Sequence, residues 1–496
     1  MVIARKQTNK NDEGQINQGQ FMNDLLDFFD TILWSSILIY LLCGTGIYLT
    51  FRLGFIQFRH FGHLFSPTLY KRKHITRGIS PWRTLCLSLA SRIGTGNLTG
   101  VAIAITLGGP GAIFWMWIIA VFNMATAMIE NTLAQIYKGN VAHEKFRGGP
   151  ADYMEKGLGM RWMGILFSLL MVISCGFIFS ALQANSIAQA SFHLLHVPAL
   201  STACILSVLV AILIFGGIRA ITWLSKWLVP LMAFAYLLLA IWVIGHHIEK
   251  LPQVLALVFK SAFGLQQAAS GALAYGVTQA ITQGMQRGAF ASEAGVGSSP
   301  NAAAMAGVSH PAMVGFSQMF AVFIDTMVIC TATALIILTS GALDQPDAPV
   351  GIRLIQQSIM PVTAGWSHVV LAILVFSFAF TSIAGNYAYA ENNLNFFHGS
   401  SPVKLLIFRL MVISMVFCGC LMELQVLWKL ADIVMALMAI LNLTALLLLS
   451  GIAVSVVKDY ERQRRMGKTP VFNPDHYPEL RGQLQPGVWD KKMPPR

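Results

Sequence analysis

Charged residues are scarce in this sequence of 496 residues, because Asp, Glu, Lys and Arg together make up only 11% of it. Hydrophobic residues make up 55%, and the mean hydropathy is +0.62. Soluble domains carry about 25% charged residues, so this composition excludes a soluble enzyme of this length. We expect a membrane protein that crosses the bilayer many times.

Paired cysteines are also missing. The seven cysteines lie in or at the ends of apolar segments without CxxC spacing, which argues against a disulfide framework and a zinc site. No histidine falls in the middle of an apolar span, and no nucleophile with a neighbouring base is visible, so an enzyme is not expected. We expect no cofactor other than a coupling ion.

The first 20 residues are polar and lack an apolar core followed by a small-residue cleavage site. We therefore expect no secretory signal peptide, and the first membrane helix is expected to serve as its own insertion signal. The formal net charge of +12 is divided among loops and tails. The enrichment of basic residues in cytoplasmic loops explains this charge more simply than a nucleic-acid partner does.

Eleven apolar stretches are long enough, at roughly 20 residues each, to cross a bilayer as helices. They lie at about 31–51, 84–107, 112–137, 162–190, 198–216, 223–247, 254–290, 311–340, 366–390, 402–421 and 427–457. The pattern predicts an all-α polytopic fold, with a polar N-terminal segment (1–30), a transmembrane domain (31–457) and a tail with little regular structure (458–496).

Basic residues mark one side of the membrane. Loops rich in Lys and Arg face the cytoplasm, and the loop between the first two spans has seven basic residues and no acid: Arg52, Arg59, Lys71, Arg72, Lys73, Arg77 and Arg83. The basic tail after residue 457 falls on the same side. We therefore expect the N-terminus outside and the C-terminus in the cytoplasm.

One apolar span is interrupted by a polar stretch at 90–97, which contains Arg92, Gly94 and Gly96. Backbone groups that leave a helix in hydrocarbon cost several kcal/mol each unless they line a cavity or meet a ligand. The stretch therefore predicts a broken helix at a binding site. The alternative is a face of small residues where two helices touch.

The second half of the chain repeats this pattern. A shift of 201 positions lays 90–97 on 291–298, with Ala, Ser and both glycines matching. Apart from the extra helix at 31–51, five spans fall in a first repeat (84–247) and five in a second (254–457). Because five is an odd number of crossings, the second repeat begins on the opposite side of the membrane from the first. It is therefore expected to be inverted, as in transporters of the leucine-transporter fold.

The position of the second break has two candidates, 270–276 and 291–298. As one helix, 254–290 would be about 55 Å long, which exceeds the bilayer and favours a break at 270–276. The other candidate would then be a gate near the cytoplasmic end.

The two breaks predict a binding site for an amino acid. N–H groups that begin the half-helix after the first break are expected to hold a carboxylate: Thr95, Gly96 and Asn97. The preferred second break would offer carbonyls to the ammonium and an apolar wall to the side chain: Gly271, Ala272 and Leu273. Gln183 either faces this pocket or hydrogen-bonds a neighbouring helix.

Adjacent hydroxyls at Thr381 and Ser382 predict a Na⁺ site, together with carbonyls between Ala90 and Gly94. In the leucine-transporter fold a sodium ion lies between the first span of one half and the third span of the other, and these are the spans concerned. The alternative is that both hydroxyls hydrogen-bond back to their own helix.

Three charged residues lie deep in the spans or beside the expected site: Arg92, Glu130 and Asp325. Charge in the bilayer core is costly and is a functional hypothesis by default. Asp325, midway along its span, has either an ion or proton role or a structural hydrogen bond. Arg92 and Glu130 are expected to pair or to brace the broken helix.

Four motifs together resemble the bacterial alanine/glycine:cation symporters, also called the sodium:alanine symporter family, over nearly the whole chain. They are SRIGTGN (91–97), GGPGAIFWMW (108–117), RGGPA (147–151) and SEAG (292–295). The resemblance implies a leucine-transporter-type fold with an extra N-terminal helix, the inner membrane, and uptake of small neutral amino acids coupled to Na⁺ or H⁺.

Two positions depart from this family. Asn386 stands where many members have Trp, and Ala272 stands close to where they have Phe. A smaller, more polar wall would widen the pocket, so glutamine or serine becomes an alternative substrate to alanine and glycine. A channel and a transporter-like nutrient sensor are alternatives from other functional classes. The expected partners are the amino acid, the ion and membrane lipid.

Overall fold

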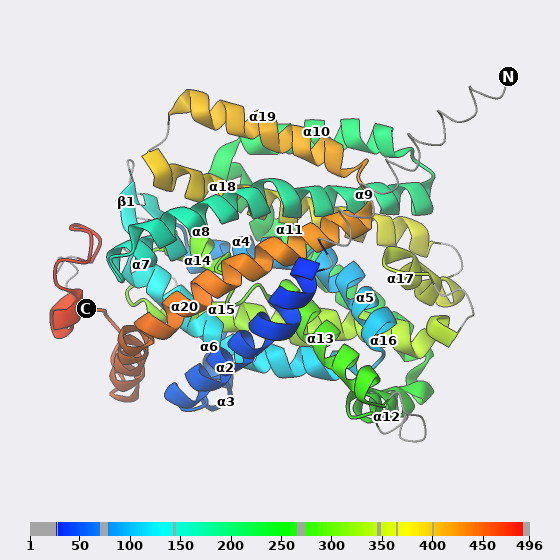
Figure 1. Cartoon of the computed structure of the whole chain (residues 1–496), viewed down its shortest axis with the longest axis horizontal. Helices are drawn as coiled ribbons and strands as arrows, with labels where there is room; N and C mark the ends of the chain where they lie inside the picture. Colours follow the sequence, from blue (N-terminus) through cyan, green and yellow to red (C-terminus); the bar gives the residue numbers. More distant parts are fainter. Residues whose placement is uncertain are drawn as a thin grey trace, which may run out of the picture.

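The structure is a computed structural model that describes residues 26, 28–69, 78–141, 145–264, 273–344, 349–363, 366–398 and 401–489. The protein is almost entirely helical (Figure 1), and the described strands form one short antiparallel hairpin, β1 (Gly139–Val141) with β2 (Lys145–Arg147). The all-α prediction is therefore confirmed.

The first half of the chain contains α2 to α11. Their bounds are α2 Ile39–Arg52, α3 Ile56–Arg59, α4 Pro81–Arg92, α5 Val101–Gly108, α6 Ala112–Ile136, α7 Pro150–Lys156, α8 Arg161–Ile173, α9 Phe179–Leu195, α10 Ala199–Phe215 and α11 Gly217–His246. Short π-helical segments precede α2 (Ile32–Leu38) and α5 (Gly96–Gly100) and join α8 to α9 (Ser174–Ile178).

The second half contains α12 to α20. Their bounds are α12 Leu251–Ala262, α13 Leu273–Ser292, α14 Ser299–Ala304, α15 Ala312–Val322, α16 Thr331–Ser340, α17 Ile352–Ile359, α18 Ser367–His398, α19 Pro402–Gly419 and α20 Leu424–Arg465. A π-helical segment, Phe323–Cys330, joins α15 to α16.

Eight helices in the described part of the chain are long and apolar enough to cross a membrane. They are Phe28–Arg52, Ala112–Ile136, Arg161–Leu195, Gly217–His246, Ala312–Ser340, Val369–Phe397, Pro402–Gly419 and Leu424–Arg465. All eight coincide with predicted spans. Gly96–Gly108 and Ala199–Phe215 are shorter apolar helices, and the count of eleven stays a prediction.

Helix α6 lies at the centre of one half of the bundle and packs against α2, α13 and α15, whereas α18 packs against α4, α8, α9 and α11. The outer faces are apolar: Trp227, Phe234 and Ile241 of α11 are each more than 60% exposed. Large apolar side chains on the outside suit contact with lipid rather than water.

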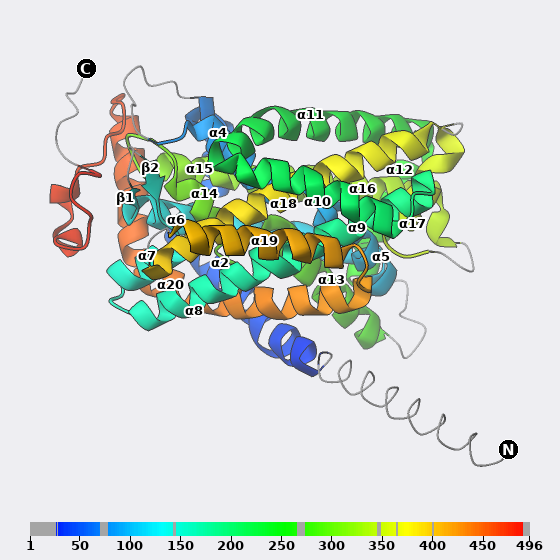
Figure 2. The same ribbon diagram turned by 90° about the horizontal axis from the view of Figure 1, so that it is seen from above.

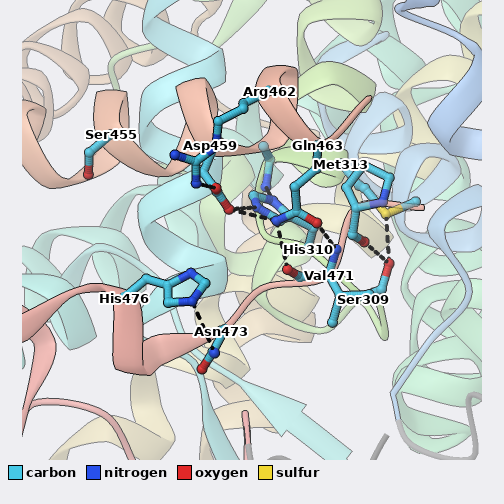
Figure 3. A network of polar contacts seen from close by, with 12 residues as sticks. Ser309, His310, Met313, Ser455, Asp459, Arg462, Gln463, Val471, Asn473 and His476 are labelled. Atoms are coloured by element: carbon cyan, nitrogen blue, oxygen red, sulfur yellow. Dashed lines mark hydrogen bonds and ion pairs between the residues drawn. The ribbon is translucent and has the colours of Figure 1, made fainter. Parts of the chain in front are cut away.

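The segment after α20 folds back over one end of the bundle. In Figures 1 and 2 this tail lies at the same end as β1 and β2, while α12, α16 and α17 gather at the opposite end. Phe472 N donates to Ser309 O (2.9 Å), and Ser309 Oγ donates to Pro470 O (2.9 Å). Figure 3 shows a neighbouring attachment, in which Val471 N donates to Gln463 Oε1 of α20 (2.9 Å). The described tail has two short 3₁₀ turns, Pro474–His476 and Pro478–Leu480.

Candidate functional site

The first broken helix is present where the polar stretch predicts it. Helix α4 ends at Arg92, and Ile93 leaves the helical conformation with ψ 88° before the chain coils again from Gly96. Two backbone donors at the break are satisfied by side chains: Gly94 N donates to Asn97 Oδ1 and Thr95 N donates to Gln183 Oε1, both at 3.1 Å. Gln183 therefore faces the break.

Two of the three predicted carboxylate donors have protein partners in this conformation. The N–H of Thr95 is held by Gln183, and the N–H of Asn97 donates to Gly94 O at 3.3 Å. The hydroxyl of Thr95, a residue only 2% exposed, has no hydrogen-bond partner among the described residues. A buried hydroxyl without a partner costs about 1–3 kcal/mol, so Thr95 Oγ1 is suited to contact a ligand.

The second break lies at 293–298. Helix α13 ends at Ser292 and α14 begins at Ser299. Between them Glu293, Gly295 and Gly297 all have positive φ, at 49°, 83° and 90°. This is the segment that matched 90–97 in the sequence.

The preferred break at 270–276 lies partly outside the described residues. Gly271 and Ala272 lie outside the described residues, and 273–276 are helical from Leu273, the first residue of α13. The stretch 254–290 is divided between α12 and α13 instead of forming one long helix. Its length therefore does not require a break within a span.

The two breaks lie side by side in antiparallel helices. Helix α13 packs against α5, and α14 packs against α4, so the first half of each broken helix lies beside the second half of the other. Ser91 Oγ donates to Glu293 Oε1 at 3.1 Å. A Cβ on Gly96 would lie 2.8 Å from the ring of Phe290, so this crossing needs glycine. An inverted repeat would produce this arrangement, although the repeat itself stays a prediction.

The predicted hydroxyl pair divides between two environments. Ser382 Oγ donates to Ala90 O (2.9 Å) and approaches Ile93 O (3.4 Å), so it touches carbonyls at the first break. Thr381 Oγ1 instead lies 2.9 Å from Ser377 O of its own helix and 3.6 Å from Met232 Sδ of α11. Ser382 therefore makes the contact with carbonyls of the first break that the predicted Na⁺ site requires, whereas Thr381 hydrogen-bonds back to its own helix.

Gly94 allows Ser382 and Gln183 to approach the break. A Cβ at this position would lie 2.5 Å from Ser382 Oγ and 2.9 Å from Gln183 Nε2. The predicted wall residue Asn386 also reaches the break, because its Oδ1 accepts a hydrogen bond from Ser91 Oγ at 2.9 Å. The described candidates from α4, α9 and α18 thus lie together.

Asp325 joins the site through Asn97. Asn97 Nδ2 donates to Asp325 Oδ1 at 2.5 Å and lies 3.3 Å from Cys330 Sγ. Thr326 Oγ1 donates to the other carboxylate oxygen at 3.0 Å, and Asp325 is fully buried. A charge in the middle of an apolar span was the sequence signal for this residue, but its partner was not foreseen.

Glu130 braces the second break rather than pairing with Arg92. It accepts hydrogen bonds from Gly295 N, Ser299 Oγ and Asn442 Nδ2, each at 3.1 Å. Asn442, on α20, also donates to Gly295 O at 3.0 Å. Asn442 was not predicted, since a single amide in an apolar span is equally typical of ordinary helix packing.

Arg92 is buried beside three carboxylates without an ion pair to any of them. It is 2% exposed, its Nη1 lies 3.5 Å from Gln318 O, and the described ion pairs do not include it. Glu130, Glu293 and Asp325 are buried as well. If all three carboxylates are ionised, the single guanidinium of Arg92 does not neutralise them, and the interior keeps a net negative charge. Such a charge favours binding of cations or protons.

A buried ion pair beside the first broken helix was also missed. Arg287 of α13 and Asp432 of α20 form a bidentate pair, with Nη1–Oδ1 at 3.0 Å and Nη2–Oδ2 at 2.7 Å. The Arg287 guanidinium lies 4.6 Å from the centre of the Trp428 ring. Both charges stand near the ends of apolar runs in the sequence, so they resembled residues that reach the membrane surface.

Comparisons with known proteins agree with the motifs. A family model described as the sodium:alanine symporter family matches residues 19–474. The chain is 46% identical over 474 residues to the uncharacterized transporter YaaJ of Escherichia coli K12, covering 95% of this chain and 99% of that protein. It is 45% identical over 457 residues to the probable sodium/glutamine symporter GlnT of Bacillus subtilis 168, covering 92% and 94%.

Solved structures share the fold at low sequence identity. The crystal structure of a mutant of the Eremococcus coleocola manganese transporter matches with a TM-score of 0.53 and 13% identity, covering 81% of this chain and 90% of that chain. At this identity the likeness concerns the fold alone. The chain therefore shares its arrangement of helices with that protein.

Proposed function

This chain belongs to the sodium:alanine symporter family, and from this premise we propose that it takes up a small neutral amino acid together with Na⁺ by alternating access. It is a multi-pass membrane transporter, not an enzyme. The observation that carries the proposal is the contact of Ser382 Oγ with Ala90 O, at a helix break inside the protein.

We place the ion at this contact. The carbonyls of Ala90 and Gly94 and the hydroxyls of Ser382 and Thr381 are hard oxygen ligands, which suit Na⁺. The buried excess of carboxylates over Arg92 supports a cation in the interior. Asp325 is the residue for the H⁺-coupled alternative, because a carboxylate can carry a proton in place of a bound ion.

The substrate carboxylate is proposed to bind at Thr95, Gly96 and Asn97. Binding there would displace Gln183 Oε1 from Thr95 N, so Gln183 and the carboxylate would compete for this donor. The proposed ammonium contacts at Gly271, Ala272 and Leu273 stay proposals. Alanine and glycine are the favoured substrates. Asn386 at the break, together with the likeness to a probable sodium/glutamine symporter, supports glutamine or serine as the second candidate.

The proposed orientation has the N-terminus outside and the C-terminus in the cytoplasm of the bacterial inner membrane, with eleven spans in a five-plus-five inverted repeat after the extra helix. One inward Na⁺ gains about 2.3 kcal/mol per 100 mV, whereas tenfold accumulation of substrate costs about 1.4 kcal/mol. One ion per substrate is sufficient for strong uptake.

The test is uptake of labelled alanine into proteoliposomes under an imposed Na⁺ gradient or an imposed H⁺ gradient, with glycine, serine and glutamine as competitors. We expect saturable uptake that follows the Na⁺ gradient and shows counterflow. Uptake without saturation or counterflow would indicate a channel. Binding of the amino acid without transport would indicate a nutrient sensor.

A further inference from the structure

A pocket outside the transport site lies where α2 and α20 end. Its volume is about 640 Å³, within the range of small-molecule sites. It is lined by the end of α2, by the turn that follows it, and by the last turns of α20. Helices α2 and α20 pack against each other (Figure 1).

The lining of this pocket is strongly basic. It includes Arg52, Arg59, Lys458, Arg462 and Arg465 against a single acid, Glu461. Glu461 Oε1 is paired with Arg59 at 3.0 Å, and Arg462 is paired with Asp459 outside the lining.

Three of these five cations have no anionic partner among the described residues. Arg52, Lys458 and Arg465 are exposed and take part in no ion pair within the described parts of the chain. Lys458 and Arg465 are seven residues apart on α20, which places them on one face of the helix, two turns from each other. The pocket is therefore lined by two exposed cations on one face of α20 and by one at the end of α2.

An apolar surface continues from the pocket along α2. Phe51 is 66% exposed and lines the pocket, Tyr48 and Ile47 are 38% and 39% exposed, and the rings of Phe51 and Phe55 lie 5.1 Å apart. The basic residues come at the ends of two membrane spans, Phe28–Arg52 and Leu424–Arg465. The pocket therefore places basic side chains next to an apolar surface, and these two features match the phosphate and the acyl chains of a phospholipid.

We infer that this pocket binds the headgroup of an anionic phospholipid, whose acyl chains lie along the outer face of α2. Arg presents a planar fork that matches phosphate oxygens, and Lys adds a point charge. An inorganic anion would use the same cations but not the apolar face. The inference rests on the membrane position of the two helices and is independent of the transported substrate.

The test measures lipid binding to the purified full-length protein by native mass spectrometry. The probes are phosphatidylglycerol, phosphatidylcholine with the same acyl chains, and inorganic phosphate. The variant is Lys458→Gln with Arg465→Gln, two exposed residues without ion pairs. The matched control is Arg219→Gln with Lys404→Gln, which removes two exposed cations at the ends of other helices.

We expect the unaltered protein and the control to bind phosphatidylglycerol in preference to phosphatidylcholine. The pocket variant should bind phosphatidylglycerol about 30-fold more weakly, the loss expected for two cations at a membrane surface. Circular dichroism of the variant should match that of the control. Equal phosphatidylglycerol affinity in variant and control would overturn the inference. So would displacement of phosphatidylglycerol by millimolar inorganic phosphate, which would mean that a free anion is the ligand.

Discussion

The side-chain amide of Asn97 donates to the carboxylate of Asp325, which connects the first broken helix to the π-helical segment between α15 and α16. The contact joins the residue that holds Gly94 N to a fully buried acid. Movement of the break during transport would therefore shift the hydrogen-bond donor of Asp325. Binding of an ion or proton at Asp325 would in turn change the hydrogen bond that Asn97 makes from the break.

Replacing Asp325 by Asn tests whether its charge is used. The Asn side chain keeps an oxygen that can accept the hydrogen bond from Asn97 but removes the negative charge. We expect ion-driven alanine uptake to fall at least tenfold, which corresponds to about 1.4 kcal/mol. The control is Cys330→Ser, which alters an uncharged neighbour of Asn97. Uptake retained in Asp325→Asn would show that the carboxylate has only a structural role.

Ser382→Ala and Thr381→Ala should differ. Ser382 touches carbonyls at the break, whereas Thr381 bonds back to its own helix. Loss of one oxygen contact of about 1 kcal/mol should raise the Na⁺ concentration for half-maximal uptake roughly fivefold in Ser382→Ala. The shift should be smaller in Thr381→Ala and largest in the double variant. An unchanged Na⁺ dependence of the double variant in proteoliposomes would remove the proposed ion site.

Gly94→Ala should abolish transport while the protein still folds into the membrane. Its Cβ would lie 2.5 Å from Ser382 Oγ and 2.9 Å from Gln183 Nε2, so the break must widen at a cost of about 1–3 kcal/mol. The matched control is Gly100→Ala, whose Cβ would meet nothing nearer than 3.5 Å. Equal uptake by the two variants would contradict the close approach of Ser382 and Gln183 to Gly94.

Asp432→Asn should destabilise the protein strongly. It leaves the buried Arg287 guanidinium without its anion, and breaking such a pair costs about 3–5 kcal/mol. The control is Glu155→Gln, because Glu155 pairs with Arg161, whose side chain is 67% exposed, and such surface pairs contribute about 0–1 kcal/mol. Thermal unfolding in detergent compares them, and similar melting temperatures would disprove the difference.

The loop between α2 and α4 should make stability depend on pH. Partial burial, with repulsion from Arg464 and His60, lowers the pKa of His63 from 6.5 to about 4. The unfolded chain therefore binds more protons than the folded protein between these values, so stability rises with pH up to about 6.5 and falls as pH decreases toward 4. Thermal melts at pH 7 and pH 5 should show a smaller loss for His63→Gln than for the unaltered protein. An equal loss would rule out His63 as the cause.

Much of the fold and part of the site follow from the sequence. Apolar length predicts the eight spans, and the cost of freed backbone in hydrocarbon predicts the first break at Gly94. The described chain breaks at 293–298, whereas apolar length favoured 270–276, because apolar composition does not reveal that α12 and α13 are separate helices. Long-range partners such as Asn442 for Glu130 depend on packing between distant segments, which the order of residues does not encode in any local pattern.

The attachment of the tail sets an order of events during synthesis. Ser309 Oγ donates to Pro470 O, a partner 161 positions further along the chain. At about 5–20 residues per second, the ribosome takes on the order of 10 to 30 seconds to reach it. During this interval the loop that follows α14 has no tail over it, although α4, α6 and α13 have already been made. The end of the bundle that carries the tail is therefore the last part to be closed, after every membrane span has been translated.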